Sequence, residues 1–374
     1  MRRRLLRAVQ LAVLAVALLL LATVLTHQGR VAAKSLGLLV EIFPSAPVYP
    51  LRLFTHEPAR TEVRYGVARG ETVADLYRPA GSGRHGAIVF YIGVGPERRN
   101  PHVVRVAEGL ARSGLVVLVP VSPGLARFRV SPEETSGVVA AFEFVRAQPF
   151  VDPSRIGIMG LSAGGAIVAL AATDPRISPD VRLVELFGSY YSAYDLLSAL
   201  ALRRIQVDDR WETWNPEPVS IDVLRNMVLD TYPASDRPAL RPLFDRGTAS
   251  IPSGLSPSGR AMAALLVNRE PARVQELIDA LPDQTKVLLS DISPATRIGE
   301  LRAEVFLMHD RDDHIIPFTE SERFYAGATA ARGRHLTELR LFRHVEPSGG
   351  NPLTLVREAT KLYAHVYGVL YRLV

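Results

Sequence analysis

The stretch IGIMGLSAGGAIVALAA, residues 156–172, decides the fold. Its first residues form a short apolar run, which is typical of a strand buried on both faces, and an Ala-rich helical pattern begins at Ala163. Gly160-Leu161-Ser162-Ala163-Gly164 joins the two as a G-x-S-x-G pattern. Glycines at these two positions leave room for a sharp turn. The stretch therefore predicts a strained strand-to-helix turn with Ser162 at its tip.

The turn places Ser162 where a nucleophile would be useful. At the amino terminus of a helix, the Ala163 N–H and the positive end of the helix dipole face a negative charge that develops beside the serine. The bare pattern also occurs by chance, and a glycine-rich turn with an incidental serine is the plain structural alternative. The apolar strand before the turn and the helix after it favour the catalytic interpretation.

Further apolar runs extend the pattern on both sides of this turn. Helical patterns separate them along the chain, which predicts parallel strands joined by crossover helices and an α/β fold. Residues 62–77 alternate in polarity and predict an antiparallel hairpin ahead of this series. The runs expected as buried strands are residues 87–92, 115–119, 156–159, 183–187 and 305–308, and a last strand is expected over residues 336–343.

A serine hydroxyl needs a histidine to take its proton and an acid to orient that histidine. The strand at 305–308 is followed by an acidic turn, His309-Asp310-Arg311-Asp312-Asp313-His314, and we predict that Asp313 is the acid. The strand at 336–343 is followed by His344, which we predict to be the general base because it fits the chain order Ser, Asp, His. Asp310 and Asp312 remain alternatives for the acid, and His309, Asp313 and His314 could also be interpreted as metal ligands.

A second backbone N–H donor for the oxyanion is expected after the strand at 87–92. The loop Gly93-Val94-Gly95-Pro96 follows it, and the Val94 N–H is the candidate that would share an oxyanion with the Ala163 N–H. A tight glycine-rich turn without a catalytic purpose would have the same sequence.

Taken together, these residues resemble the α/β-hydrolase superfamily, and within it the dienelactone-hydrolase-like and prolyl-oligopeptidase-like enzymes. The resemblance covers residues 61–195 and 282–374. It is carried by ADLYRP at 74–79, VDPSRIG at 151–157, the turn at Ser162 and Ser293-Pro294. In that branch the acid precedes x-x-Val-Pro, which matches Asp313 before His314-Ile315-Ile316-Pro317.

Two departures from the family pattern limit what the resemblance implies. Dienelactone hydrolases have cysteine where this chain has Ser162, which argues against their substrate. The usual His-Gly ahead of the oxyanion loop is here Ile92-Gly93. The family implies an α/β-hydrolase fold with a mostly parallel central sheet flanked by helices, and hydrolysis of an acyl substrate.

The strand rhythm stops between the two parts of the expected core. Residues 196–282 carry helical patterns between Pro-rich loops and predict an inserted helical cap. The expected organisation is thus a core over residues 61–195 and 283–374 with the cap between them. Substrate choice in such folds often depends on a cap of this kind.

The amino-terminal residues predict a membrane anchor. Residues 8–26 are apolar apart from Gln10, Thr23 and Thr26, and about 19 residues at a rise of 1.5 Å approach the ~30 Å hydrocarbon core of a bilayer. Arg2, Arg3, Arg4 and Arg7 precede the run, which predicts a cytoplasmic start and an extracytoplasmic body. A cleaved signal peptide, with a secreted body, is the alternative. Residues 27–60 are expected to link the anchor to the body, along the membrane surface or packed on the body.

Composition excludes several classes of function. The formal charge is +6, but four positive charges lie in the first seven residues, and the body lacks the clustered basic residues that nucleic acid binding requires. The chain has no cysteine, which excludes a thiol nucleophile, disulfides and thiolate metal sites. We therefore expect a membrane-anchored serine hydrolase that cleaves carboxylic esters or amides of a small-molecule or peptide substrate, without a cofactor or metal. An inactive membrane-tethered binding protein on the same fold is the alternative from another class.

Overall fold

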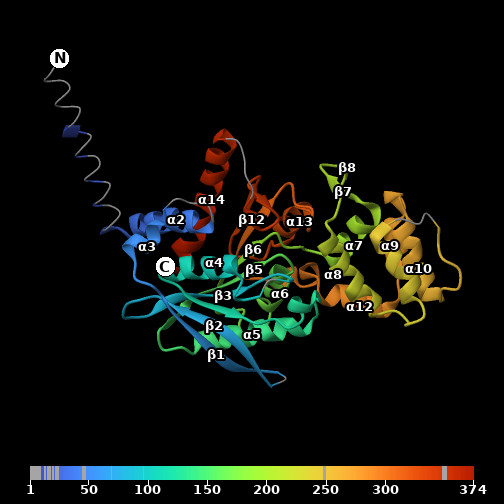
Figure 1. Ribbon diagram of the computed structural model, residues 1–374, viewed down its shortest axis with the longest axis horizontal. Coiled ribbons are helices and arrows are strands. Elements are labelled where there is room, and N and C mark those ends of the chain that lie inside the picture. Colours follow the sequence, from blue (N-terminus) through green and yellow to red (C-terminus); the bar gives the residue numbers. More distant parts are fainter. Residues whose placement is uncertain are drawn as a thin grey trace, which may run out of the picture.

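The computed structural model describes residues 10, 11, 14, 18, 21, 25–43, 48–68, 70–95, 97–246, 250–347 and 352–374. An eight-stranded sheet forms the centre of the molecule, in the order β1-β2-β4-β3-β5-β6-β9-β10 (Figure 1). Strands β1 and β2 form the predicted antiparallel hairpin, β2 also pairs antiparallel with β4, and every other pairing in this sheet is parallel. The strands are β1 (Ala59–Val67), β2 (Gly70–Arg78), β3 (His85–Tyr91), β4 (Val116–Pro120), β5 (Val151–Leu161), β6 (Val181–Phe187), β9 (Glu304–Asp310) and β10 (Arg334–Leu339).

Helices cover both faces of the sheet because the central strands are apolar on both sides. In β3, Ala87, Val89 and Tyr91 belong to one core cluster, while Ile88 and Phe90 belong to the other. Helices α5 (Glu133–Arg146) and α6 (Ala163–Ala171) cover the first face. Helices α2 (His27–Ile42), α4 (Pro101–Arg112) and α14 (Pro352–Leu373) cover the second. The predicted α/β architecture, a mostly parallel sheet flanked by helices, is confirmed.

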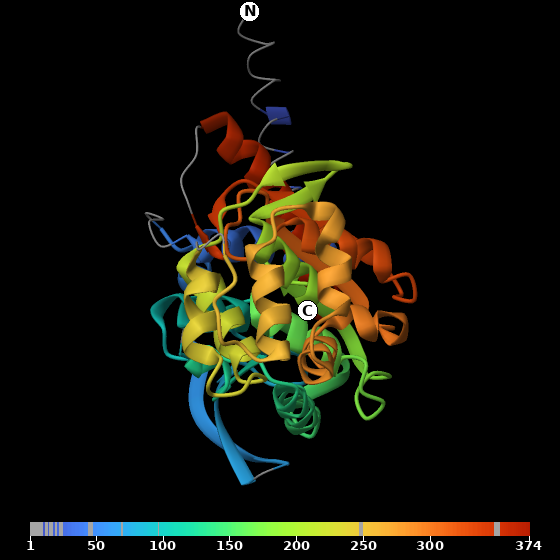
Figure 2. The ribbon, with the colours of Figure 1, turned by 90° about the vertical axis from the view of Figure 1, so that its right-hand side faces the viewer.

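The chain between β6 and β9 leaves the sheet and forms the end of the molecule seen on the right of Figure 1. Turned toward the viewer, its yellow and orange helices lie in front of the body (Figure 2). They are α7 (Ala193–Leu202), α8 (Pro218–Leu229), α9 (Arg237–Arg246), α10 (Pro257–Val267), α11 (Val274–Asp279) and α12 (Asp283–Asp291). We use "the cap" for residues 196–282 of this region, and the limits of the cap as a domain remain a prediction.

The start of the segment 196–282, predicted to be helical, is helical only as far as Leu202. Helix α7 ends at Leu202 because Arg203 has a φ of 56°, in the left-handed region that terminates helices. A two-stranded hairpin follows, β7 (Arg204–Val207) and β8 (Arg210–Thr213), joined by Asp208 and Asp209 at φ 44° and 63°. Two left-handed residues in a row are the geometry of a type I′ hairpin turn. Asp-Asp lacks the glycine that usually signals this turn, so the hairpin escaped prediction.

The last predicted strand is also divided. Strand β10 ends at Leu339, and Phe342–Arg343 form the separate strand β11, which pairs with β12 (Glu346–Pro347) away from the main sheet. The break lets the chain turn across the end of the sheet before it reaches His344.

The residues before the sheet pack on the body as helices. Helix α2 buries Val31 and Leu38 against the second face, and α3 (Pro50–Phe54) buries Leu51 against α2. The predicted anchor, residues 8–26, lies for the most part outside the described residues. Among those that are described, no helix combines the length and the apolar character needed to cross a membrane.

Candidate active site

Ser162 stands on a strained turn between β5 and α6. Its φ is 53° and its ψ −133°, a backbone conformation that side-chain-bearing residues rarely adopt. Its neighbours have no room for side chains. A Cβ on Gly160 would lie 2.5 Å from the Gly165 Cα, and a Cβ on Gly164 would lie 2.6 Å from the Ile92 carbonyl oxygen. The two elbow glycines are therefore required by close backbone approach, as their spacing predicts.

The loop after β3 passes directly over the serine. A Cβ on Gly93 would lie 2.8 Å from the Ser162 Cβ, so only glycine lets the loop come this close. The next residue, Val94, lines the same apolar pocket as Ser162 and Ala163. The two residues expected to supply oxyanion donors thus flank the serine, one from the loop and one from the first position of α6.

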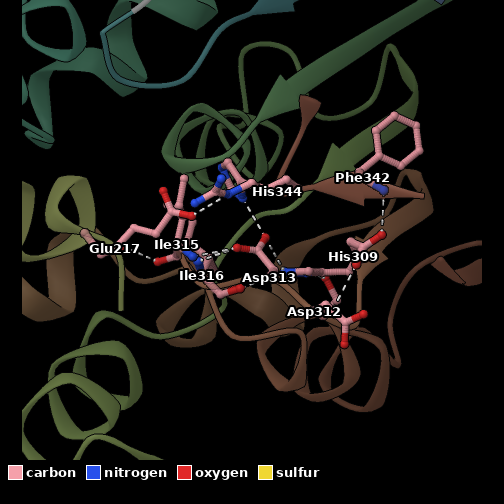
Figure 3. A network of polar contacts seen from close by, with 12 residues as sticks. Glu217, His309, Asp312, Asp313, Ile315, Ile316, Phe342 and His344 are labelled. Carbon is pink, nitrogen blue, oxygen red and sulfur yellow. Dashed lines mark hydrogen bonds and ion pairs between the residues drawn. The ribbon is translucent and has the colours of Figure 1, made fainter. Parts of the chain in front are cut away.

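Asp313 and His344 are brought together from the ends of two strands, although they are 31 residues apart. The His344 Nδ1 lies 2.5 Å from the Asp313 Oδ2, and both side chains are buried (Figure 3). The other ring nitrogen, Nε2, is buried and has no hydrogen-bond partner among the described residues. His344 and Ser162 line one cavity of about 420 Å³. An imidazole held in this way at one nitrogen can accept or release a proton at the other.

The carboxylate of Asp313 is fixed by four contacts. Its Oδ1 accepts the N–H groups of Ile315 and Ile316 at 2.7 and 3.0 Å, and its Oδ2 faces His344 and, at 3.2 Å, the Nε2 of His309. Burial alone would raise the pKa of this carboxyl, but the charges of His344 and His309 and their hydrogen bonds outweigh burial and hold the pKa well below its usual value. The group is therefore ionised and can balance a positive charge on His344.

His309 is the second histidine on this acid, and the sequence did not point to that role. It is fully buried, with Nδ1 2.7 Å from the Ser321 Oγ and Nε2 3.0 Å from the Ile316 carbonyl oxygen. These bonds fix the ring against Asp313. The metal interpretation of this turn finds no support in the geometry: His314 is exposed, and no group of three or more ligand side chains is gathered for a metal ion anywhere in the described chain.

The two alternative acids lie elsewhere. Asp310 is buried at the end of β9, and its Oδ2 accepts the N–H groups of Leu341 and Phe342, both at 2.8 Å. Burial raises its pKa. Its carboxyl binds the backbone segment that turns toward His344, and it forms no hydrogen bond with the His344 ring among the described residues. Asp312 is exposed and forms a 3.6 Å ion pair with Arg340.

The cap is bonded directly to the turn that carries Asp313, a contact that no sequence pattern predicted. The Trp214 Nε1 donates to the Asp313 carbonyl oxygen at 3.0 Å, and the Ser220 Oγ donates to the Ile315 carbonyl oxygen at 2.6 Å. Glu217 donates its N–H to the His314 carbonyl oxygen at 2.8 Å, and its carboxylate pairs with Arg343 at 2.9 Å. Only long-range contact information would have found these residues, because Trp214 and Ser220 belong to no motif.

A second pocket lies on the other side of Ser162 and is almost wholly apolar. It holds about 40 Å³ and lies between the elbow, α7 and α8. Its size suits a group of a few carbon atoms. The side chains that close it are Val94, Val130, Tyr190, Leu196, Val223, Leu224, Met227, Ile315 and Ile316.

Comparisons with known proteins agree with this geometry. The model of the prolyl oligopeptidase family matches residues 127–177, which span α5, β5, the elbow and α6. No curated protein sequence matches the chain. Among solved structures, an acylaminoacyl peptidase in complex with Z-Gly-Gly-Phe-chloromethyl ketone is similar with a TM-score of 0.50 at 14% identity, over 86% of this chain and 42% of that one.

Two further structures come from other hydrolases. A 2,6-dihydroxy-pseudo-oxynicotine hydrolase is similar with a TM-score of 0.50 at 13% identity, over 83% of this chain and 68% of that one. A dienelactone hydrolase from Anabaena variabilis has a TM-score of 0.44 at 16% identity, over 83% and 97% of the two chains. The chain thus spans about two fifths of the peptidase and about two thirds of the oxynicotine hydrolase.

The eight-stranded sheet and the similarity to the two structures with a TM-score of 0.50 show that the chain has an α/β-hydrolase fold. Over residues 127–177, which include the elbow, the chain is similar to the prolyl oligopeptidase family.

The depressed pKa of Asp313 predicts a pH-dependent loss of stability in Asp313→Asn. A folded-state pKa below the unfolded-state value of about 3.9 adds stability that is present above about pH 4 and is lost as pH falls through the folded-state pKa. We expect Asp313→Asn to lower the free energy of unfolding by about 1.5–3 kcal/mol near neutral pH, because hydrogen bonds to a charged group are lost. Urea unfolding followed by circular dichroism measures the difference at each pH.

Asp312→Asn is the matched control, since it makes the same change one residue away on an exposed side chain. It should leave stability nearly unchanged at all pH values. A deficit of Asp313→Asn that stays constant into the acid range would contradict an ionised acid in the folded protein.

Proposed function

We propose that the protein cleaves carboxylic esters through an acyl-enzyme formed on Ser162. The observation that carries this proposal is the buried Nε2 of His344, which has no hydrogen-bond partner among the described residues, on a side chain that lines the same cavity as Ser162 and is held at Nδ1 by Asp313. A buried nitrogen without a hydrogen-bond partner costs free energy, and such exceptions in folded proteins often have a catalytic role. The role that this geometry supports is to accept the proton of the Ser162 hydroxyl.

In the first half of the reaction, the Ser162 Oγ attacks the ester carbonyl and His344 Nε2 takes its proton. The carbonyl oxygen gains a negative charge, which the N–H groups of Val94 and Ala163 and the dipole of α6 stabilise. The tetrahedral intermediate then breaks its bond to the leaving oxygen. His344 passes the proton to that oxygen, and the alcohol departs.

In the second half, water takes the place of the alcohol. His344 accepts a proton from the water as its oxygen attacks the acyl carbon, and returns the proton to the Ser162 Oγ as the acid leaves. Asp313 keeps the imidazole in one tautomer and balances its charge in both halves. No cofactor or metal takes part in this scheme.

The apolar pocket beside Ser162 supports a short acyl group as the preferred substrate. Its volume of about 40 Å³ has room for only a few carbon atoms, and Leu224 and Met227 of α8 close it. A long acyl chain would need these side chains to move. Alcohol groups of different sizes can occupy the larger cavity on the His344 side.

Peptide hydrolysis is the second candidate, favoured by the match to the prolyl oligopeptidase family. The same serine, histidine and acid serve both reactions. Ester and amide substrates with the same acyl group distinguish the two, since an esterase turns over the ester alone at a useful rate.

For the location of the protein, we propose a single amino-terminal anchor over residues 8–26 with the body on the extracytoplasmic side. Support comes from the length and apolar character of this run and from the four arginines before it. Secretion after signal cleavage is the alternative.

Removal of the nucleophile should abolish both covalent labelling and turnover. We expect a fluorophosphonate probe to label wild type but not Ser162→Ala. The control Ser198→Ala, which changes a serine of α7 that lines neither pocket, should label like wild type. Turnover of p-nitrophenyl acetate should fall on the order of 10⁴-fold or more in Ser162→Ala. Gel fluorescence and absorbance measure the two effects. Equal labelling of all three proteins would refute the role of Ser162, and a wild type that neither labels nor turns over substrate would favour a binding protein.

Enlarging the apolar pocket should shift the preference for acyl length. We expect Met227→Ala to raise kcat/KM for p-nitrophenyl octanoate relative to acetate by roughly tenfold or more, because each methylene accommodated in an apolar pocket contributes about 1 kcal/mol or more. Met262→Ala is the control, since Met262 is equally buried in α10 but does not line the pocket. A parallel shift in both variants would show that the pocket does not hold the acyl group.

The anchor predicts that the full-length chain resists alkaline extraction from membranes, and that protease added outside spheroplasts digests the body. Immunoblotting after each treatment measures both. A shortened chain in the medium would support cleavage, and a body digested only after lysis would contradict the orientation.

A further inference from the structure

Helix α2 has a buried inner face and an outer side whose residues are apolar and only partly covered. Its inner face packs on α4 and α14, where Leu38 comes so close that a Cβ on Gly109 would lie 2.7 Å from its side chain. The outer face carries Gly29, Ala32, Leu36 and Val40 at the spacing of one helix face. On this outer face, the described chain leaves Leu36 largely exposed.

Helix α3 lies against α2 and enlarges this surface. It is seated at Gly37, where a Cβ would lie 2.7 Å from Leu51, and it exposes Leu53 and Phe54. The exposed fractions are 57% for Leu36, 68% for Leu53 and 86% for Phe54, and Leu25 just before α2 is 65% exposed. We use "the docking face" for Leu25, Leu36, Leu53 and Phe54.

From these observations we infer that the docking face rests in the interfacial layer of the membrane into which residues 8–26 are proposed to insert. This inference rests on the proposed anchor. The apolar run ends at Thr26, whose side chain caps the amino terminus of α2 by accepting the Gly29 N–H at 2.9 Å. No linker separates the end of the run from α2, so a run that spans the bilayer delivers α2 to its surface.

The charges near the docking face fit a membrane with anionic headgroups. Residues 27–56 contain Arg30, Lys34 and Arg52 but a single acidic residue, Glu41, which is buried against Arg52 at 3.3 Å. Basic residues beside an apolar helix face are typical of segments that lie in the headgroup region.

A row of tyrosines on α14 reaches the start of α2. Tyr363, Tyr367 and Tyr371 stand one helical turn apart with ring centroids 6.2 and 5.8 Å from one another, and Tyr371 lies 5.1 Å from the ring of His27 at the start of α2. Tyrosine is favoured where one end of a side chain is in lipid and the other in water. In this orientation the α2, α3 and α14 side of the body faces the bilayer, and the cap at the other end of the molecule points away from it (Figure 1).

Single-cysteine spin labels test the inference on the full-length chain, because the chain has no cysteine of its own. The reporter variants are Leu36→Cys and Phe54→Cys, and the control is Val287→Cys on α12, which is 58% exposed and far along the chain from the docking face. Each labelled protein is reconstituted in vesicles of phosphatidylglycerol and phosphatidylcholine. Electron paramagnetic resonance then compares collision with oxygen, which enters lipid, and with a water-soluble nickel chelate.

We expect both reporters to favour oxygen over the nickel chelate several-fold more than the control does. Adding Leu36→Asp to Phe54→Cys should shift the label at 54 toward the nickel chelate while the protein still floats with the vesicles. Reporters as accessible to the chelate as the control would overturn the inference. So would dipolar coupling between labels on two copies, because it would assign the docking face to self-association.

The same samples separate this inference from the two proposals before it. Loss of vesicle flotation in a density gradient reports failure of the anchor, which removes the inference with it. Loss of ester turnover in the reconstituted protein reports failure of the hydrolase proposal and leaves the label accessibilities to be judged by themselves.

Discussion

The turn at Ser162 is the constraint on which the site depends. A residue with a side chain is held at a φ of 53° because the backbone on both sides leaves no alternative path. Gly160 lies against Gly165, Gly164 lies against Ile92, and Gly93 lies against Ser162 itself. These four glycines allow the close packing that holds Ser162 in its strained backbone conformation. The strain is maintained by the packing of β3, the end of β5 and α6, of which β3 and α6 are almost wholly buried.

Asp313 and His344, the proposed acid and base, are held by polar contacts between loops and not by close backbone packing. Asp313 is saturated by two backbone N–H groups and two histidines, and Asp310 holds the backbone that leads to His344. The two aspartates have opposite pKa shifts for one reason. Asp313 faces histidines, which lower its pKa, while the backbone N–H groups that bind Asp310 do not overcome the effects of burial and of the Asp312 charge, which raise its pKa. The three acidic residues of this turn therefore differ in their contacts. Asp313 contacts His344, Asp310 binds the backbone that leads to His344, and Asp312 forms an exposed ion pair with Arg340.

Much of this could be predicted from the sequence because it depends on local patterns. The elbow, the strand series and the chain order of Ser162, Asp313 and His344 follow from residue types within short windows and from the rule that parallel strands end at the same edge of a sheet. Failures occurred where local signals conflict with tertiary contacts. Asp208 and Asp209 form a tight turn without glycine, β10 stops three residues before β11 because Asp310 binds the intervening backbone, and the bonds from Trp214 and Ser220 join residues about 95 or more positions apart.

Those long-range bonds give the cap a part in the site beyond closing a pocket. Trp214, Glu217 and Ser220 lie within seven residues and bond to three successive residues of the acid turn, Asp313, His314 and Ile315. Ser220 also lines the apolar pocket, and α8, which begins at Pro218, supplies Leu224 and Met227 to it. One short segment thus connects the wall of the apolar pocket to the turn that carries Asp313, the proposed partner of the base His344. Because packed contacts of this kind transmit small displacements, a change in the pocket wall and a change in the position of Asp313 are not independent in this protein.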